Sequence, residues 1–373
     1  MTGRYVKRMS GKKKKAFLYA YDKVNLGDDL FIRFITSRYP DCEFTTISNK
    51  VNIENFKDIK NLHIIDENST KINIMNKIHP SLFANYQHKL KMKSDAVCYI
   101  GGSIFMEGDT WKQVVNWWDF QVNNYPFYVL GANFGPYKTE EYRNKMRNVF
   151  SKLKGICFRD RYSYELFSDI KSAKVAPDIL FGQKIPEVIE KKKQVFVSVV
   201  NCENKSIDDI ELRKCNDDYY NWLKIEIDNA LKNGYDVKLS SFCKSEGDEE
   251  ICNRLQADFS DVDCSAKVGC LFYNGRNHVE MLREIASSSI VVSARFHGII
   301  LALISNVPVL PVSYSIKTIN ALKDMGFTGM IQNIKNIDNS CHFTDATIDI
   351  NICVDKLIEK SEEHFMELDT VLK

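Results

Sequence analysis

The stretch from Ser287 to Leu303 reads SSSIVVSARFHGIILAL and decides the fold class. Its uninterrupted run Ile290-Val291-Val292 is typical of a strand that is buried on both faces, and apolar residues recur at helical spacing from Gly298 onward. The sequence therefore predicts a strand that leads into a helix, with Arg295 and His297 at the turn. Open α/β sheets bind ligands at this end of their strands, and helix starts attract anions. Both residues are thus candidate site residues, although an ion-paired arginine and a helix-capping histidine are the alternative interpretation.

The composition limits the classes of protein to which this chain can belong. Its 373 residues suggest two domains, and its 44% hydrophobic and 27% charged residues are ordinary for a soluble globular protein. The 51 Lys and Arg against 49 Asp and Glu leave a formal net charge of +2, which does not favour nucleic acid as a partner. Because no apolar run reaches about 18 residues, we expect at most a peripheral membrane contact.

The cysteines and the N-terminus indicate a cytoplasmic protein. Eleven cysteines occur, but the first residues lack the apolar core of a secretory signal. The cysteine spacing does not predict a zinc site, and the carboxylates show no ligand spacing, so we expect no metal and no cofactor. The charge run from Lys12 to Lys15 is interpreted either as a solvated tail or as a patch that contacts anionic lipid at the inner face of a membrane.

Short apolar strands alternate with helical patterns in two series, which is the signature of parallel sheets with crossover helices. The predicted strands are 16–19, 96–100, 127–130 and 156–158 in the first series and 195–200, 237–240, 290–292 and 307–310 in the second. The polar segment FGQKIPEVIEKKKQ between Phe181 and Gln194 predicts a linker. We therefore expect an N-terminal domain over 1–182, a linker over 183–194 and a C-terminal domain over 195–373, whose last helical segment can pack back on the first domain.

The predicted fold class is α/β, with two doubly wound, Rossmann-like domains facing each other across a cleft, which is the default ligand site. The first wall of this cleft carries three turn motifs that follow strands. They are Asn25-Leu26-Gly27-Asp28-Asp29, Gly101-Gly102, and G-x-N-x-G-P from Gly131 to Pro136 with Asn133 at its centre. Taken singly, each motif can be a structural turn.

The ordered set of motifs is more specific than any member. Together with R-D-x-x-S at Arg159, Asp160 and Ser163, Pro177-Asp178, and R-x-H-G at Arg295 to Gly298, it resembles the polysaccharide pyruvyl transferase family. The resemblance extends from about Tyr19 to about Gly326. It implies a glycosyltransferase-B-like fold and the transfer of pyruvate from phosphoenolpyruvate onto a sugar of a surface-polysaccharide precursor, usually as a cyclic ketal. The R-x-H element of the family is associated with phosphoenolpyruvate binding and transfer.

The resemblance places the donor on the second domain. Phosphoenolpyruvate carries a phosphate and a carboxylate, so its site needs at least two cationic or N–H-rich elements. The expected donor-binding residues are Arg295, His297, Gly298, Lys317, Arg159 and Asn201. Many family members have an arginine where this chain has Asn201, so Arg159, Arg161 or Lys317 has to supply the missing charge. We expect Arg295 and His297 to be catalytic, with His297 as the acid and base because histidine titrates near neutrality.

The acceptor is expected on the first domain, and it is a saccharide that is free, nucleotide-bound or lipid-linked. The expected acceptor-binding residues are Asn25, Gly27, Asp28, Gly101, Gly102, Trp111 and Asn133. The rings of Trp111, Trp117 and Trp118 either stack on a sugar or pack in the core. Two other functions stay open: a glycosyltransferase that uses a nucleotide sugar, and a non-catalytic protein that binds anionic glycans. The sequence does not predict an oligomeric state.

Overall fold

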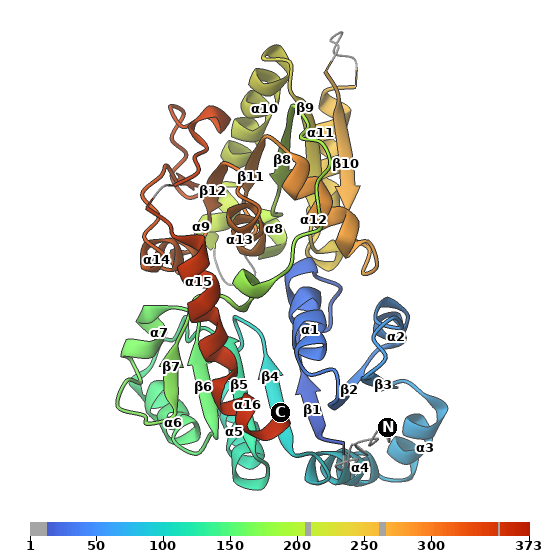
Figure 1. Cartoon of the computed structure of the whole chain (residues 1–373). Coiled ribbons are helices and arrows are strands. Elements are labelled where there is room, and N and C mark those ends of the chain that lie inside the picture. The colour runs from blue at the N-terminus through green and yellow to red at the C-terminus, as the bar shows by residue number, and fades with distance from the viewer. Residues whose placement is uncertain (1–12, 206–209, 261–265, 350) are drawn as a thin grey trace, which may run out of the picture.

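The computed structural model describes residues 13–205, 210–260, 266–349 and 351–373. Its first sheet contains β1 (Lys15–Tyr19), β2 (Glu43–Ser48), β3 (Leu62–Asp66), β4 (Ala96–Ile100), β5 (Phe127–Ala132), β6 (Gly155–Phe158) and β7 (Ala173–Val175). Its helices are α1 (Leu26–Arg38), α2 (Lys50–Asn55), α3 (Thr70–Ile78), α4 (Pro80–Met92), α5 (Trp111–Asn124), α6 (Glu140–Phe150) and α7 (Arg161–Glu165). These elements form the lower half of the molecule in Figure 1.

The second sheet contains β8 (Gln194–Ser198), β9 (Asp236–Ser241), β10 (Val268–Phe272), β11 (Ile290–Ser293), β12 (Val309–Ser313) and β13 (Gln332–Asn333). The helices that follow β8 in the chain are α8 (Cys202–Lys205), α9 (Ile210–Lys214), α10 (Asn216–Lys232), α11 (Asp248–Asp258), α12 (His278–Ser287), α13 (Phe296–Ile304), α14 (Ile316–Asp324), α15 (Val354–Ser361) and α16 (Met366–Leu372). The first sheet ends with β7 and the second begins with β8, so the change of sheet falls between Val175 and Gln194.

Both sheets are parallel and share one topology. The strand orders are β3-β2-β1-β4-β5-β6-β7 and β10-β9-β8-β11-β12-β13, which confirms the predicted α/β class with two doubly wound domains. The direction of winding reverses between β1 and β4 and between β8 and β11, and ligands bind at such switch points. The motifs after β1, β4 and β11 all lie at these positions.

Five strands were not predicted from the sequence: β2, β3, β7, β10 and β13. Composition is one reason, because β2 reads EFTTIS and shows mostly half-buried positions. The outermost strands β3 and β10 are likewise largely half-buried. A strand at the edge of a sheet needs fewer apolar residues than a central one, and β3, which reads LHIID, lacks the continuous run that marks β4 or β11. The edge strand β10 reads VGCLF and is apolar throughout, so composition does not explain why it was missed.

The domains meet around α1. One continuous cluster of buried apolar residues includes Leu26 and Phe31 from α1 together with Phe242 and Ile299 from the second domain. The backbone N–H of Leu26 donates to the carbonyl of Phe242 at 3.0 Å, which brings the end of β9 against the start of α1.

The C-terminal segment crosses to the first domain, where Figure 1 shows α15 and α16 running down over its sheet. Arg38 of α1 donates to Glu362 at 2.6 Å and to Asp369 at 2.8 Å. His364 lies in the turn between these helices, and its Nε2 is 2.7 Å from the carbonyl oxygen of Pro177. The C-terminal segment is thus fixed to the first domain at α1 and at Pro177.

Candidate active site between the domains

His297 brings the second domain against the first. It lies in the first turn of α13, directly after β11, and its side chain is 15% exposed. Its Nε2 is 3.5 Å from Nη1 of Arg159 and 3.9 Å from Oδ2 of Asp178, both of the first domain. The ring meets Phe31 of α1 edge-on, with 5.1 Å between the centroids. The imidazole is therefore enclosed by residues from both domains.

Two glycines leave the space that this arrangement needs. A Cβ atom at Gly27 would run into the imidazole ring of His297, and a Cβ atom at Gly102 would run into the guanidinium of Arg159. Because Gly27 and Gly102 have no side chain, His297 and Arg159 can lie directly against the backbone of the two turns.

Arg159 follows β6 and is fixed by three neighbours. Its Nε donates to Oδ1 of Asn133 at 2.6 Å, its Nη1 donates to Oδ2 of Asp178 at 3.0 Å, and its guanidinium lies 4.9 Å from the ring centroid of Phe296. Asn133 in turn donates to Asp160. These contacts set the plane and position of the guanidinium, so Asn133 has a positioning role here.

Lys317 approaches the same region from α14 of the second domain. Its Nζ donates to Oγ of Ser103, the residue after Gly101-Gly102, at 3.3 Å. Burial and, to a smaller extent, the nearby charge of Arg159 lower the pKa of Lys317 to about 8, and Asp160 opposes the shift. An anion bound beside Lys317 would favour its charged form.

Arg295 shows an arrangement that differs from the expected one. We expected a guanidinium open to an anion, but Arg295 is paired with Glu246 and with both carboxylate oxygens of Asp248. Its side chain is 7% exposed. Burial alone would lower the pKa of Arg295, but the two carboxylates outweigh it and hold that pKa above its usual value. These are the contacts of the ion-paired arginine that the sequence left as the alternative.

Asn201 and Gly298 support the turn around Arg295. Oδ1 of Asn201 accepts the backbone N–H groups of Glu203 at 3.0 Å and Asn204 at 3.3 Å, and its own N–H donates to Asp248. Asn201 is 3% exposed. Gly298 is buried in the first turn of α13. The structure records no direct contact of Asn201 or Gly298 with Arg159 or Lys317.

The expected acceptor residues divide into two groups. Asn25 caps α1 by accepting the N–H of Gly27 at 3.1 Å, and Asp28 lies in the first turn of the same helix. Gly101 directly follows β4 and precedes Gly102. Trp111 instead packs edge-on against Tyr142, with 5.7 Å between the ring centroids. Trp118 is buried in the core, whereas Trp117 is 37% exposed.

The structure brings together between the domains six residues that were predicted from the sequence: Gly27, Gly102, Asn133, Arg159, His297 and Lys317. Three further residues contact them and had no predicted role: Asp178, Ser103 and Phe296. Asp178 could have been predicted as a site residue, because the Pro177-Asp178 pair is one of the ordered motifs. Ser103 follows the Gly-Gly turn directly, so its position after β4 was readable as well.

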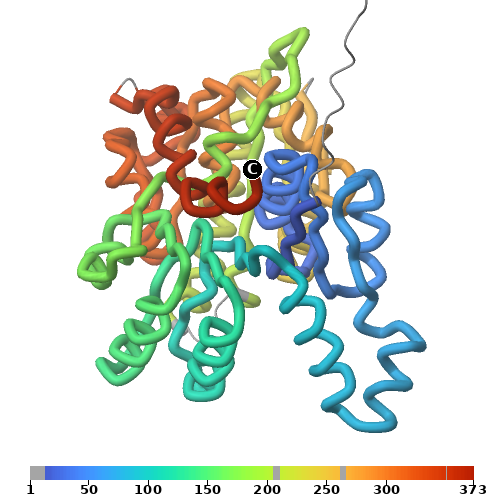
Figure 2. The backbone as a smooth tube through the Cα atoms, turned by 60° about the horizontal axis from the view of Figure 1, so that its bottom comes forward, coloured from blue at the N-terminus to red at the C-terminus, as the bar shows by residue number. Residues whose placement is uncertain are grey.

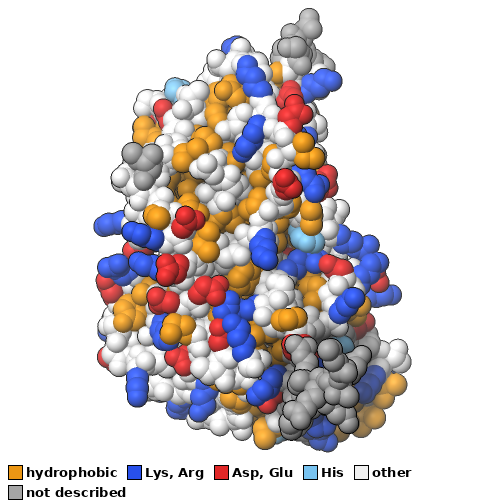
Figure 3. Space-filling view, in the orientation of Figure 1, with side chains coloured by type: hydrophobic (Ala, Val, Ile, Leu, Met, Phe, Trp, Pro, Cys, Tyr) orange, Lys and Arg blue, Asp and Glu red, His pale blue; other side chains and the backbone are white. Residues whose placement is uncertain are grey.

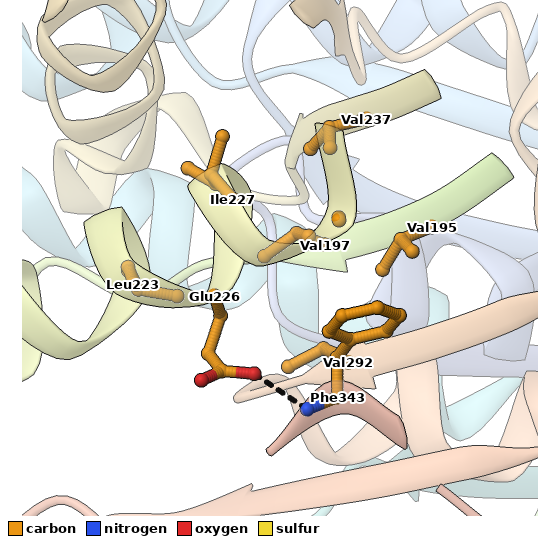
Figure 4. A pocket seen from close by; sticks show the side chains of 9 residues that line it. Val195, Val197, Leu223, Glu226, Ile227, Val237, Val292 and Phe343 are labelled. Carbon is orange, nitrogen blue, oxygen red and sulfur yellow. Dashed lines mark hydrogen bonds between the residues drawn. The ribbon is translucent and has the colours of Figure 1, made fainter. Parts of the chain in front are cut away.

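A separate cavity lies inside the second domain and is shown in Figure 4. Its lining is almost wholly apolar and includes Val195, Val197 and Val292. Its one carboxylate, Glu226, accepts the backbone N–H of Phe343 at 2.5 Å. Since this cavity offers no cation, it does not suit an anionic substrate. Over the described residues, no group of three or more His, Cys, Asp or Glu is placed to hold a metal ion.

Basic and acidic side chains are interspersed over much of the face shown in Figure 3. Lys12 of the basic run lies outside the described residues. Lys13 and Lys15 lie 3.7 and 3.5 Å from Glu43. None of the helices in the described part of the chain is long and apolar enough to span a membrane.

Solved structures define the class of fold. HepE from Anabaena, determined with UDP and glucose, is 12% identical, with a TM-score of 0.54 over 96% of this chain and 97% of that one. UDP-GlcNAc 2-epimerase from Methanocaldococcus jannaschii is 12% identical, with a TM-score of 0.51 over 97% and 93% of the two chains. At this identity the likeness shows the fold alone, which is the glycosyltransferase-B architecture of two Rossmann-like domains.

The family follows from the sequence. The profile of the polysaccharide pyruvyl transferases matches residues 25–316, so the chain belongs to that family. Amylovoran biosynthesis protein AmsJ from Erwinia amylovora is 21% identical over 273 residues, which span 69% of this chain and 66% of AmsJ. The resemblance to this family that was inferred from the ordered motifs is therefore confirmed.

Proposed function

We propose that this enzyme transfers the pyruvyl group of phosphoenolpyruvate to a saccharide and forms a pyruvyl ketal. The observation that carries the proposal is the convergence of Arg159, His297 and Lys317 between the two domains. Phosphoenolpyruvate presents two anionic groups, and the guanidinium and the ammonium offer one cationic partner for each. Membership of the family supports pyruvyl transfer in polysaccharide biosynthesis.

In this proposal Arg159 and Lys317 hold the donor and Arg295 does not. Asp248 and Glu246 already balance the charge of Arg295. Arg159 has Asp178 as its carboxylate partner at 3.0 Å, and Lys317 has a hydroxyl as its hydrogen-bond acceptor. Each charge-assisted contact to the donor contributes about 1.5–3 kcal/mol. Many family members have an arginine where this chain has Asn201. In this proposal Arg159 and Lys317 supply the positive charge that this arginine would provide.

His297 serves as the proton carrier. A proton is added to the methylene carbon of phosphoenolpyruvate, and a sugar hydroxyl forms a bond to the adjacent carbon. The bond from that carbon to the phosphate oxygen then breaks, and a second hydroxyl takes the vacated position. One hydroxyl proton replaces the proton used to make the methyl group, and the other leaves with the phosphate, so no oxidant or reductant is needed. An imidazole can donate the first proton and accept the second.

The acceptor binds on the first-domain side in this proposal. Gly27, in the turn with Asn25 and Asp28, lies against the imidazole of His297, and Gly102, in the turn with Gly101, lies against the guanidinium of Arg159. Asp28 is half-buried at the start of α1 and is a carboxylate that can accept a hydrogen bond from a sugar hydroxyl. A lipid-linked saccharide is one form of this acceptor.

The test is to incubate the enzyme with phosphoenolpyruvate and a panel of saccharides, free, nucleotide-bound and lipid-linked. Released phosphate is measured together with the mass of the acceptor and its acid-labile pyruvate. We expect acceptor-dependent phosphate release that Lys317→Ala reduces at least tenfold, whereas Lys323→Ala, an exposed lysine on the same helix, leaves the rate unchanged. A parallel reaction with UDP-glucose measures UDP; release of UDP without any phosphate would assign the chain to the glycosyltransferases instead.

A further inference from the structure

The hairpin of α3 and α4 takes no part in the site between the domains but has a distinctive charge. Between Glu67 and Asp95 the sequence contains no acidic residue, whereas it contains five lysines. They are Lys71, Lys77, Lys89, Lys91 and Lys93. Figure 2 shows this hairpin projecting from the body of the first domain. A local excess of positive charge therefore stands out on a chain whose formal net charge is only +2.

Exposed apolar side chains lie among these lysines. Ile74 is 52% exposed, Ile78 is 70% exposed and Leu82 is 38% exposed. Lys71, Ile74 and Ile78 are spaced by three and four residues and share one face of α3. Nζ of Lys71 lies 4.6 Å from the ring centroid of Tyr86 in α4, so this face of α3 continues onto α4.

The opposite face of the hairpin anchors it to the domain. Ile72 is buried, and Lys91 is 4% exposed. Nζ of Lys91 donates to Oε1 of Gln121 at 3.0 Å and to the hydroxyl of Tyr19 at 3.2 Å. The inner face thus makes the contacts that hold the hairpin to the domain, whereas Ile74 and Ile78 of the outer face are largely exposed.

We propose that the outer face of the α3–α4 hairpin binds an anionic lipid surface. Helices that lie in the membrane interface combine apolar side chains with lysines in this way. The isoleucines would enter the boundary of the acyl chains while the lysines meet the headgroup phosphates, each lysine strengthening binding roughly fivefold. The proposal goes beyond the proposed function and does not depend on it. It would bring the enzyme to a membrane that carries a lipid-linked acceptor.

The test is sedimentation of the full chain with vesicles of phosphatidylglycerol and phosphatidylethanolamine, at low and high salt. We expect binding at low salt, release at high salt, and little binding to vesicles of phosphatidylcholine alone. Lys71→Glu/Lys77→Glu should weaken binding more than tenfold. Ile74→Asn/Ile78→Asn should weaken it several-fold and leave the residual binding sensitive to salt.

The matched control is Ile225→Asn on α10 of the second domain, where Ile225 is 49% exposed. This variant should bind vesicles as the wild type does, and all variants should keep the circular dichroism spectrum of the folded chain. Failure of the wild type to bind at low salt, or equal binding by the hairpin variants, would overturn the proposal. So would a concentration-dependent dimer that forms without lipid and is lost in Ile74→Asn/Ile78→Asn, because a second copy would then be the partner. Phosphate release with a water-soluble acceptor is measured separately, so the two proposals fail independently.

Discussion

Two arginines at strand ends, Arg159 after β6 and Arg295 after β11, have similar burial but different surroundings. Their side chains are 11% and 7% exposed. Arg295 is paired with two carboxylates of its own domain, whereas Arg159 is paired with Asp178 and lies 3.5 Å from the imidazole of His297 across the domain boundary. The difference teaches that a position at a strand end does not make a charge available. Whether an arginine at a strand end can bind an anion depends on how many carboxylates already pair with its guanidinium.

The largest effect that we expect is on turnover. In His297→Ala the proton carrier beside Arg159 is lost, and turnover should fall by a factor on the order of 10²–10⁴. The rate of phosphate release at saturating phosphoenolpyruvate measures it. The free energy of unfolding is measured as the control, so that the loss of ring packing against Phe31 is separated from the loss of the proton carrier. Normal turnover in this variant would remove His297 from the mechanism.

Next in size is a loss of stability at the other arginine. Arg295→Ala would leave the buried carboxylate of Asp248 without its cation, and the free energy of unfolding should fall by about 3–5 kcal/mol. Urea denaturation measures this. The double variant Arg295→Ala/Asp248→Asn should recover part of the loss, because the charge of the fully buried Asp248 is then removed as well. A single variant as stable as the wild type would show that the pair is not needed for the fold.

Lys317 provides a test that depends on pH. Its pKa of about 8 lies below the usual value for lysine because of burial and of Arg159, so the ammonium is lost as the pH rises through about 8. Affinity for phosphoenolpyruvate should then fall up to tenfold per pH unit above that value. In Lys317→Arg the charge persists, and the fall should shift to a much higher pH. Identical pH profiles for the two proteins would contradict a role for this ammonium.

The smallest effect concerns a buried carboxylate that has a tyrosine as its partner. Tyr273 donates to Asp29 across the domain boundary at 2.7 Å, and burial raises the pKa of Asp29 to about 7. In the folded state ionisation is therefore disfavoured, and this group costs stability increasingly as the pH rises from about 4 to about 7. Asp29→Asn keeps the acceptor and removes the charge, so it should stabilise the protein by on the order of 2 kcal/mol at pH 8.

Below about pH 4 the stabilisation by Asp29→Asn should disappear, because the carboxyl is protonated in both the folded and the unfolded state. Thermal unfolding at the two pH values checks the sign. A variant that is less stable than the wild type at pH 8 would show that the charge of Asp29 supports the interface.

Much of the fold was predictable because the central strands are apolar runs that end in turn motifs. The strand at Ile290 to Val292 and the helix after it are clear in the sequence, whereas β2 and β3 mix polar and apolar residues. The placement of His297 and Arg159 at strand ends was equally readable. The partners of Arg295 were not, since Glu246 and Asp248 lie 49 and 47 residues away in the sequence and meet it only when β9 and β11 join one sheet.

The most direct measurement is the affinity for phosphoenolpyruvate of Arg159→Lys and Arg295→Lys, determined side by side by calorimetry under conditions in which both variants are folded. The account predicts that Arg159→Lys weakens binding by about 10–100-fold, because a contact worth about 1.5–3 kcal/mol is lost with the planar guanidinium. Arg295→Lys should bind within about threefold of the wild type, since its guanidinium is held by Asp248 and Glu246. The opposite ranking, with Arg295→Lys defective and Arg159→Lys normal, would contradict the account.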